Sequence, residues 1–299
     1  MTSARTVQRI TVVGAGAMGC QIAMVAALAG LDVAVHDLDD AAFARARAAL
    51  GARMQRDVEK GRRSQSDVDA AWARLSFTTD LGAAAEGSDV VVEAAVEKLD
   101  VKRGLFTTLD GLVAEHTILA SNSSSFVPSR LADATRRPDR VCNMHFFNPA
   151  LVMKCVEIVP GPDTSEDTTA SVAALARRMG KEPVVLTKEI HGFLANRILN
   201  AVRDEAIRLY EGGYAGIAEI DTVCRTALGY PMGPFELMDL TGVDIGYHVK
   251  LARFEETGDP QDAPSATVTE LVRQGRLGRK TGSGFYDYHA DGHPTEGAR

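Results

Sequence analysis

A short apolar run that ends in a glycine-rich turn and continues into a helix-forming stretch constrains this chain most. Residues 10–13 are apolar or β-branched, residues 14–19 read GAGAMG, and residues 20–30 are rich in alanine and other apolar residues. A strand, a G-x-G-x-x-G turn and a helix in this order form a binding site for the pyrophosphate of a dinucleotide. The exposed amide groups and the positive dipole end of the helix face the phosphates. The sequence therefore predicts a dinucleotide site.

The three glycines of this turn have separate tasks. Gly14 permits the tight turn, Gly16 lets the backbone approach a pyrophosphate, and Gly19 lets the helix pack on the strand. Ala17 and Met18 lie between them, where the helix begins. The predicted cofactor contacts in the turn are Gly14, Gly16, Ala17, Met18 and Gly19.

An aspartate after the second predicted strand indicates which dinucleotide binds. Residues 32–36 are β-prone and are followed by Asp37, 18 residues beyond Gly19. A carboxylate at this position accepts hydrogen bonds from both hydroxyls of an adenine ribose and repels a 2′-phosphate. No arginine follows before Arg45. We therefore predict NAD rather than NADP; the alternative for Asp37 is a solvated loop residue or a helix cap.

The composition argues against several functional classes. The 299-residue chain has a formal net charge of −7, which argues against a general nucleic-acid binder. Its longest apolar stretch, residues 22–31, is too short for a membrane span. Four widely separated cysteines without a C-x-x-C pair predict reduced thiols, and neither a disulfide framework nor a metal site. The amino terminus has no signal-type apolar region, so we expect a cytoplasmic protein.

The first part of the chain alternates helical and strand-like segments. Helices are expected over residues 41–61 and 66–75. Apolar, β-prone segments that read as buried strands are residues 89–94, 117–120, 140–146, 154–159 and 183–186. Strands spaced by helices imply a Rossmann-type, doubly wound and mostly parallel sheet.

The later part of the chain has a helical pattern instead. Helices are expected over residues 196–211, 217–228 and 235–256, separated by glycine and proline breaks. We therefore expect a Rossmann-like NAD-binding domain over residues 1–188, followed by an all-α domain over residues 189–299. The helical domain is small and apolar, so we expect it to bury surface against a second copy in a homodimer.

A histidine and a glutamate in the later strands are candidates for acid–base chemistry. His145 lies at the end of a predicted strand, where the carboxyl ends of a parallel sheet face the ligand crevice. Glu157 lies 12 residues further on, in an apolar run where a lone carboxylate is costly to bury unless it is paired. If the two strands are close, Glu157 would fix the tautomer of the imidazole, as a general base for an alcohol requires. The alternatives are a core histidine with satisfied hydrogen bonds and a strand-edge glutamate.

Three further polar features leave alternatives open. Residues 121–125 follow a buried strand and form either a plain polar loop or a source of hydroxyl and amide donors at the crevice. Asn196 begins a predicted helix, where asparagine is a good N-cap. The basic residues between positions 53 and 63, which include Lys60, form either a solvated helix face or a clamp for the phosphates of a large anionic carrier.

Together these motifs resemble the short-chain L-3-hydroxyacyl-CoA dehydrogenase family, above all its bacterial 3-hydroxybutyryl-CoA dehydrogenases. Besides the glycine turn, the matching segments are residues 91–97 (VVEAAVE), 119–125 (LASNSSS), 144–149 (MHFFNP), 152–157 (VMKCVE), 192–197 (GFLANR), 230–237 (YPMGPFEL) and 278–286. With the glycine turn, these segments extend the resemblance over residues 8–288.

The resemblance implies roles for five residues in catalysis and substrate binding. It implies that His145 is the catalytic base and that Glu157 is its partner in a His–Glu dyad. It implies that Ser124 hydrogen-bonds the substrate oxygen and that Asn196 helps to fix the acyl group. Lys60 aligns loosely with the CoA clamp of the family, because the surrounding helix differs in length. An acyl-CoA substrate follows from the same resemblance.

The resemblance also implies how NAD is held. Asp37 matches the ribose-binding acid of the family. Residues at the positions that contact the nicotinamide cofactor are Glu97, Lys102, Asn122 and Asn148.

The implied reaction is the reversible NAD-dependent oxidation of an L-3-hydroxyacyl-CoA, expected to be of short chain, to the 3-ketoacyl-CoA. His191 and Leu151 stand where the family has prolines, and Ser123 replaces a threonine; the first two changes leave the acyl-chain preference open. Two other functions also remain open. One is a related dehydrogenase that acts on a carrier-protein-bound hydroxyacyl group or a free hydroxy acid. The other is an NAD-binding protein with an idle site.

Overall fold

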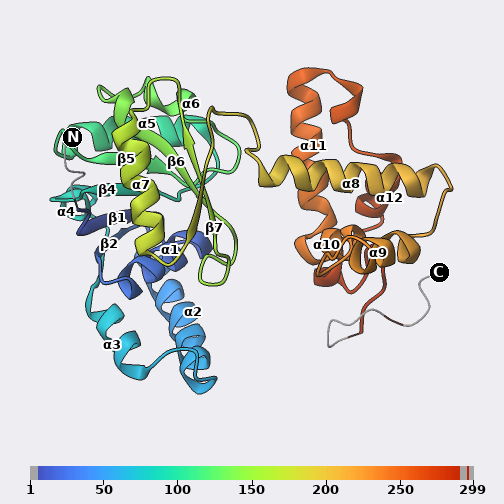
Figure 1. The fold of residues 1–299 in the computed structure, drawn as a ribbon, viewed down its shortest axis with the longest axis horizontal. Helices are drawn as coiled ribbons and strands as arrows, with labels where there is room; N and C mark the ends of the chain where they lie inside the picture. The colour runs from blue at the N-terminus through green and yellow to red at the C-terminus, as the bar shows by residue number, and fades with distance from the viewer. Residues whose placement is uncertain (1–5, 290–294, 296–299) are drawn as a thin grey trace. The chain divides into compact units, whose positions relative to one another are not determined.

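The computed structural model describes residues 6–289 and residue 295. It divides into two compact units, and the division falls between Leu194 and Ala195. The first unit contains one sheet with helices, and the second consists of helices and connecting segments (Figure 1). The expected fold class, a Rossmann-type doubly wound sheet followed by an all-α part, is confirmed.

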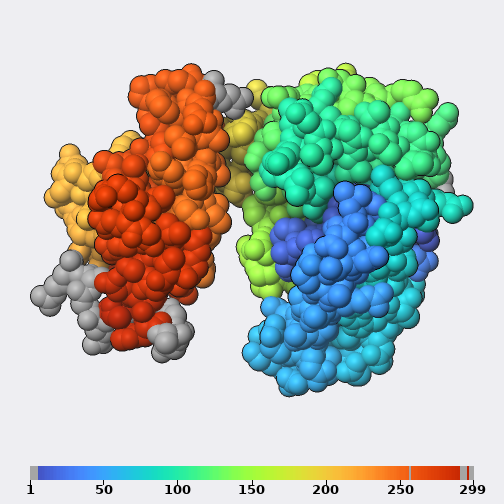
Figure 2. All heavy atoms as spheres, turned by 180° about the vertical axis from the view of Figure 1, so that it is seen from behind, coloured from blue at the N-terminus to red at the C-terminus, as the bar shows by residue number. Residues whose placement is uncertain are grey.

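The first unit alternates strands and helices along the chain. Its strands are β1 (Arg9–Val13), β2 (Asp32–His36), β3 (Leu75–Thr78), β4 (Val90–Glu93), β5 (Ile118–Ser121), β6 (Val141–Phe146), β7 (Cys155–Pro160) and β8 (Glu182–Val185). Its helices are α1 (Ala17–Leu28), α2 (Asp40–Glu59), α3 (Gln65–Ala73), α4 (Leu81–Ala85), α5 (Leu99–Leu112), α6 (Ser129–Ala132), the 3-10 turn η1 (Pro138–Arg140) and α7 (Glu166–Arg178). Figure 2 shows α2 and α3, in lighter blue, forming one end of this unit.

The sheet has the strand order β3-β2-β1-β4-β5-β6-β7-β8. Neighbouring strands are parallel except β6 and β7, which run antiparallel. The strand order reverses between β1 and β4, and in open sheets of this kind ligands bind outside the carboxyl ends of the strands at that point. Because β1, β4, β5 and β6 are parallel, their carboxyl ends lie along one edge of the sheet.

The central strands are apolar because they are buried on both faces. Every residue of β4, β5 and β6 is buried. A parallel sheet covered by helices leaves no face for water, so its strands carry continuous apolar runs. Glu93, Asn143 and His145 interrupt these runs and are almost fully buried. Buried polar groups of this kind need partners, and the partners of these three residues form the site described below.

The second unit is built from helices around an aromatic core. Its helices are α8 (Ala195–Glu211), α9 (Ile217–Thr226), α10 (Pro234–Thr241), α11 (Val243–Thr257) and α12 (Ala266–Arg273), with 3-10 turns η2 (Pro260–Asp262) and η3 (Arg279–Thr281). Phe235 is fully buried and packs on Phe285, which belongs to the segment after η3. The carboxylates of Asp221 and Asp239 accept hydrogen bonds from the backbone of this unit.

Some local predictions from the sequence are wrong. The expected helix over residues 235–256 is two helices, because Gly242 has a φ of 101°, a left-handed backbone conformation that interrupts the helix. The expected helix over residues 66–75 ends at Ala73, and its last residue begins the edge strand β3. Helix α12 has no counterpart among the expected elements. β3 and α12 are short, with four and eight residues, so each offers few positions from which a pattern can be recognised.

The described residues contain neither a helix able to span a membrane nor a cluster of metal-ligating side chains. No helix within residues 6–289 is both long and apolar enough to cross a bilayer. Across the same part of the chain, no group of three or more acidic, histidine or cysteine side chains is arranged to hold a metal ion. The thiols of Cys20, Cys142 and Cys224 are buried and that of Cys155 is half-buried; all four are free.

Candidate active site

The glycine turn between β1 and α1 leaves no space for a side chain at two of its glycines. Gly14 has a φ of 108°, and a Cβ at this position would lie 2.5 Å from the carbonyl oxygen of Ala94. A Cβ on Gly19 would lie 1.9 Å from the carbonyl oxygen of Gly14. Both distances are far below van der Waals contact, so any side chain would displace backbone. The turn can therefore be built only with glycine at these two positions.

Gly16 differs, because it faces open space rather than backbone. A Cβ on Gly16 would meet no atom within 4 Å. Gly16 is also the N-cap residue of α1, and no side chain caps the helix there. The first helical residues, Ala17 and Met18, follow it, and Ala17 is exposed. An uncapped helix N-terminus with open space beside it suits a pyrophosphate, so this turn fits NAD.

Asp37 lies directly after β2, next to the same turn. One of its carboxylate oxygens, Oδ2, accepts a hydrogen bond of 2.7 Å from the backbone N–H of Ala15, and Oδ1 accepts one of 3.2 Å from Asp39. Each carboxylate oxygen has a second lone pair. The carboxylate is thus fixed against the glycine turn and can still accept hydrogen bonds from ribose hydroxyls.

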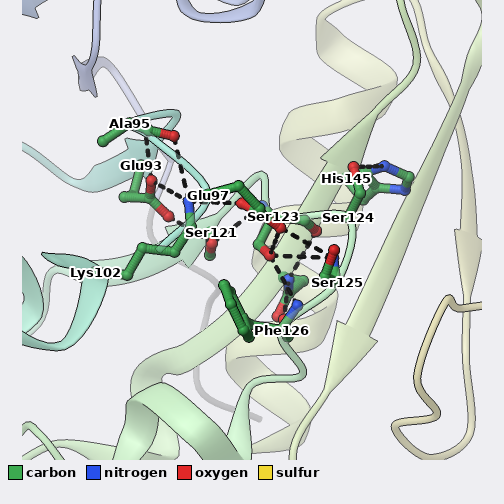
Figure 3. A network of polar contacts seen from close by, with 11 residues as sticks. Glu93, Ala95, Glu97, Lys102, Ser121, Ser123, Ser124, Ser125, Phe126 and His145 are labelled. Atoms are coloured by element: carbon green, nitrogen blue, oxygen red, sulfur yellow. Dashed lines mark hydrogen bonds and ion pairs between the residues drawn. The ribbon is translucent and has the colours of Figure 1, made fainter. Parts of the chain in front are cut away.

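An ion network lies at the carboxyl ends of β4 and β5; its Lys102 and Glu93 side chains are buried and its Glu97 side chain is partly exposed (Figure 3). The ammonium of Lys102, a residue of α5 that is 1% exposed, lies 2.6 Å from Oε1 of Glu93 and 3.1 Å from Oε2 of Glu97. Glu93 is fully buried, and its other oxygen accepts a hydrogen bond of 2.6 Å from Ser121. The network holds two carboxylates around one ammonium.

The Glu97 carboxylate joins this network to the serine loop. Its Oε1 accepts hydrogen bonds from the hydroxyl of Ser123 and from the backbone N–H of Ser125. Burial alone would raise the pKa of Glu97, but the hydrogen bond from Ser123 and the charge of Lys102 outweigh it and lower the pKa. Glu97 is therefore held as an anion. Glu97 and Lys102 line a small pocket of the first unit together with Met18, Ala94, Ala95, Asn122, Ser124 and Ser125.

Asn122 ties the carboxyl ends of three strands together. Its backbone N–H donates to the carbonyl oxygen of Glu93 at 2.8 Å, and its side-chain Oδ1 accepts a hydrogen bond of 2.8 Å from the backbone N–H of Phe146. β5 therefore lies fixed between β4 and β6 where the pocket opens. Asn148, two residues beyond β6, is exposed.

His145 and Glu157 are directly opposite each other on the antiparallel strands β6 and β7. His145 Nδ1 lies 3.0 Å from Glu157 Oε2, and both residues are at most 3% exposed. The other ring nitrogen, Nε2, lies 3.1 Å from the hydroxyl of Ser124 (Figure 3). Because an ionised carboxylate only accepts hydrogen bonds, Nδ1 carries the proton and Nε2 of the neutral ring is the acceptor.

The histidine–glutamate pair is held from several sides. The second oxygen of Glu157, Oε1, accepts a hydrogen bond of 2.9 Å from the backbone N–H of Leu194. The rings of Phe147 and Phe193 pack edge-on against the imidazole, with centroids 4.7 and 5.3 Å away. These contacts leave the imidazole little rotational freedom. The ring is thus fixed with Nε2 next to the exposed residue Ser124.

Two residues singled out from the sequence belong to other elements than those that build this cluster. Lys60 is exposed and follows the last residue of α2; nearby, the buried Asp57 carboxylate pairs with Arg53 at 3.3 Å and with Arg62 at 3.4 Å. Asn196 is half-buried in the second unit, one residue after the first residue of α8, rather than before that helix. The site built from the first unit does not include either side chain.

Sequence reasoning missed two residues of the cluster. Glu93 is the partner of Lys102, and Asn143 donates hydrogen bonds to the serine loop. The signal for Glu93 was present: like Glu157, it is a single carboxylate in an apolar strand. No pattern along the chain distinguishes Asn143 from a core residue, because its partners are backbone carbonyls of a loop.

The glycine turn at the switch point, the acid after β2 and the histidine–glutamate pair at the same edge define a class, the NAD-dependent oxidoreductases. Models of the 3-hydroxyacyl-CoA dehydrogenase family match both parts of the chain: the NAD binding domain over residues 9–190 and the C-terminal domain over residues 192–288. The chain belongs to the 3-hydroxyacyl-CoA dehydrogenase family. NAD as cofactor and an oxidoreductase activity are therefore confirmed.

The names of individual relatives are consistent with this family. The human mitochondrial hydroxyacyl-coenzyme A dehydrogenase is 39% identical, over 94% of this chain and 91% of its own length. A probable 3-hydroxybutyryl-CoA dehydrogenase of Bacillus subtilis is 40% identical, over 94% of this chain and 98% of its own. The crystal structure of an (S)-3-hydroxybutyryl-CoA dehydrogenase from Ralstonia eutropha has a TM-score of 0.88 and 38% identity, with 95% and 100% of the two chains covered.

Proposed function

We propose that this enzyme oxidises short-chain L-3-hydroxyacyl-CoA to 3-ketoacyl-CoA, and catalyses the reverse reaction, with His145 as general base. The observation that carries the proposal is the position of the imidazole: Nδ1 faces Glu157, while Nε2 faces the exposed hydroxyl of Ser124. A base for an alcohol needs the lone pair of an unprotonated nitrogen within hydrogen-bond reach of the substrate hydroxyl. Nε2 of His145 has this lone pair at the edge of the sheet where ligands bind.

The proton of the alcohol passes to His145 in this reaction. In the oxidation, Nε2 takes the hydroxyl proton of the substrate, and the imidazole becomes an imidazolium. The Glu157 carboxylate, 3.0 Å from Nδ1, stabilises this positive charge without taking a proton itself. Ser124 hydrogen-bonds the substrate oxygen, which becomes the carbonyl oxygen of the product. In the reverse reaction the imidazolium returns the proton to that oxygen.

The residues around the glycine turn and the pocket hold the cofactor. NAD held by these residues would supply the acceptor for the hydride that leaves C3 of the substrate. The amides at the start of α1 bind its pyrophosphate, and Asp37 binds the adenine ribose. Glu97 and Lys102, with Asn122 and Asn148, would hold the nicotinamide end. The small pocket lined by Met18, Glu97, Asn122 and Ser124 supports this placement, because it joins the start of α1 to the serine loop.

The substrate class is proposed from the relatives and from charge. The Bacillus and Ralstonia relatives are named as 3-hydroxybutyryl-CoA dehydrogenases, which supports a short acyl chain. Lys60, exposed at the end of α2, would bind the phosphates of the carrier. Asn196, at the start of α8, would fix the acyl group. The same basic region would also accept the phosphopantetheine of a carrier protein, which remains the alternative.

We propose further that the enzyme is a cytoplasmic homodimer. The four free thiols fit a reducing compartment. The second unit carries large exposed apolar side chains, among them Ile198, Val223 and Ile245, which are 64%, 56% and 55% exposed. Apolar side chains exposed to this extent favour burial against a second copy. Sedimentation at micromolar concentration should give the mass of a dimer, and a concentration-independent monomer would contradict this proposal.

The variant His145→Gln tests the catalytic proposal. We expect kcat for the reduction of acetoacetyl-CoA by NADH to fall by about 10³-fold, since glutamine cannot exchange the proton. The dissociation constant for NADH, measured by fluorescence, should stay within about twofold, because His145 lies outside the pyrophosphate turn. Near wild-type kcat in a folded His145→Gln protein would contradict the assignment of the base.

A further inference from the structure

The loop that carries Ser124 is a tight turn held from two sides. The hydroxyl of Ser123 accepts hydrogen bonds from the backbone N–H groups of Ser125 and Phe126, at 3.2 and 2.8 Å, and donates to Glu97 (Figure 3). These bonds satisfy the amide groups of the turn. They leave the carbonyl oxygens of Ser123 and Phe126 to be satisfied by another element, since buried backbone acceptors need donors.

Asn143 supplies both of the missing donors. It lies in the middle of β6, opposite Ser121 of β5, and is fully buried. Its side-chain Nδ2 lies 3.2 Å from the carbonyl oxygen of Ser123 and 3.0 Å from that of Phe126. A side-chain amide has two N–H groups, so each can point to one carbonyl. Asn143 therefore joins the beginning and the end of the serine turn to the strand that carries His145.

The other atom of this amide shows that asparagine is not simply filling space. Asn143 Oδ1 is buried and has no hydrogen-bond partner among the residues that the structure describes. Burying an acceptor without a donor costs stability, whereas an apolar side chain of similar size would avoid that cost. Unlike an apolar side chain, the amide supplies two N–H donors. Their recipients are the two carbonyl groups on either side of Ser124 and Ser125.

We infer that Asn143 is a positioning residue for the reaction, which fixes the Ser124 hydroxyl relative to His145. Asn143 and His145 are two residues apart on β6, so their side chains lie on the same face of the strand. The Asn143 side chain hydrogen-bonds the backbone of the turn. The Nε2 atom of His145 lies 3.1 Å from the hydroxyl of Ser124 in the same turn. A change at Asn143 reaches the substrate only through Ser124. This inference rests on the proposed roles of Ser124 and His145.

A double-mutant cycle tests the inference. The proteins are wild type, Asn143→Ala, Ser124→Ala and the double variant, each assayed for kcat/KM with acetoacetyl-CoA and NADH. We expect Asn143→Ala to lower kcat/KM by about tenfold in the wild-type background, because small displacements of positioning groups are costly. In the Ser124→Ala background the same substitution should change kcat/KM by less than about twofold, because the group it positions is gone. An equal loss in both backgrounds would overturn the inference.

Two further variants control for folding and for buried hydrogen bonds in general. Asn143→Ser keeps one hydrogen-bond donor, so its loss of kcat/KM should be smaller than that of Asn143→Ala. A folded Asn143→Ser protein with wild-type kcat/KM would also overturn the inference. Thr117→Val removes another buried side-chain bond of the sheet, from Thr117 Oγ1 to the carbonyl oxygen of Ser88 at 2.7 Å. It should leave kcat/KM within about twofold of wild type, and a tenfold loss there would show that any such deletion suffices.

The same cycle separates a failure of this inference from a failure of the proposed function. If Ser124→Ala alone retains wild-type kcat/KM, the proposed role of Ser124 is wrong. If Ser124→Ala is impaired and Asn143→Ala is not, only the inference about Asn143 is wrong. NADH binding, followed by fluorescence, should be unchanged in Asn143→Ala, because Asn143 has no place in the glycine turn.

Discussion

Each unit of this enzyme holds a carboxylate by hydrogen bonds, but the pKa values of the two carboxylates are shifted in opposite directions. Asp239 of the second unit is 1% exposed, whereas the side chain of Glu97 in the first unit is 41% exposed. In the second unit, Asp239 accepts hydrogen bonds from the backbone N–H groups of Phe285 and Tyr286 and from the hydroxyl of Tyr288. Burial dominates there and raises the pKa of Asp239. In the first unit, burial also acts to raise the pKa of Glu97, but Ser123 and Lys102 outweigh it, so the pKa is lowered.

The difference shows which hydrogen-bonded carboxylates are able to act on a ligand. Glu97 lines a pocket, has a charged partner and stays ionised, so it can act on a ligand. Asp239 accepts hydrogen bonds from the backbone N–H groups of Phe285 and Tyr286 and from the hydroxyl of Tyr288, and these bonds attach the segment that ends at Tyr288 to α10. Burial of an acid alone therefore does not indicate a site. The nature of its partners and the presence of open space beside it do.

Asp239→Ala gives the largest expected loss of stability, and it should spare catalysis. The substitution leaves two backbone N–H groups and the Tyr288 hydroxyl without an acceptor, which should lower the free energy of unfolding by about 3 kcal/mol. Urea unfolding measures this loss. The fraction that remains folded should keep the wild-type kcat.

The isosteric variant Asp239→Asn is the matched control. It keeps the size and one acceptor oxygen of the side chain, so it should cost clearly less stability than Asp239→Ala. An unchanged urea midpoint for Asp239→Ala, or a loss of kcat with full stability, would break the contrast between the two units.

Asp37→Ala should mainly weaken cofactor binding, and it should cost less stability than Asp239→Ala because Asp37 accepts two backbone hydrogen bonds and Asp239 accepts three bonds at a buried site. Loss of the two hydrogen bonds to the ribose should raise KM for NAD by about tenfold, and discrimination against NADP should fall as well. Asp39→Ala is the control: Asp39 caps α2 by accepting a hydrogen bond of 2.9 Å from Ala41, so its loss should affect stability and leave KM unchanged. An unchanged KM for NAD in Asp37→Ala would show that the ribose lies elsewhere.

Substitution of Asp110 should give the smallest effect of these substitutions. Asp110 also shows that the first unit has an acidic residue with a purely structural role. It lies in α5 and is 5% exposed, with Arg136 Nε and Arg137 Nε both at 2.7 Å from its carboxylate. Burial would raise the pKa of Asp110, but hydrogen bonds from Arg136 and Arg137 outweigh it, so the pKa is lowered.

The lowered pKa gives the direction of a pH effect on stability. A carboxyl with a lower pKa in the folded state stabilises the protein above the unfolded pKa of about 4, and this contribution is lost as the pH falls through the folded value. Asp110→Asn should therefore cost about 1–2 kcal/mol at neutral pH and much less in acid. Urea unfolding at several pH values checks this. A cost that grows as the pH falls would contradict the assigned ion pairs.

How far the sequence could predict this enzyme depended on the range of the interactions involved. The glycine turn and Asp37 were predictable because their task is set by local backbone geometry, as the positive φ of Gly14 shows. The pairing of His145 with Glu157 needed the assumption that their strands are neighbours. The register of β6 and β7 satisfies it.

The features that sequence reasoning missed depend either on contacts between distant parts of the chain or on the backbone conformation of a single residue. Asn143 bonds to carbonyls 17 and 20 residues away, and Gly242 breaks a helix through its own backbone conformation rather than through a change in periodicity. Neither effect appears in the alternation of polar and apolar residues. The roles of Lys60 and Asn196 rest on the family resemblance and stay predictions.

The central claim is that this site reduces and oxidises acyl groups carried on CoA, and the most direct test is a comparison of substrates. NADH consumption by the wild-type enzyme should be measured with acetoacetyl-CoA, with the acetoacetyl group on a carrier protein, and with free acetoacetate. Binding energy from a remote carrier is used in the transition state, so we predict a kcat/KM for acetoacetyl-CoA that exceeds the value for free acetoacetate by about 10³-fold or more. A higher kcat/KM for the carrier protein or for free acetoacetate, or no NADH consumption with any of the three, would contradict the account.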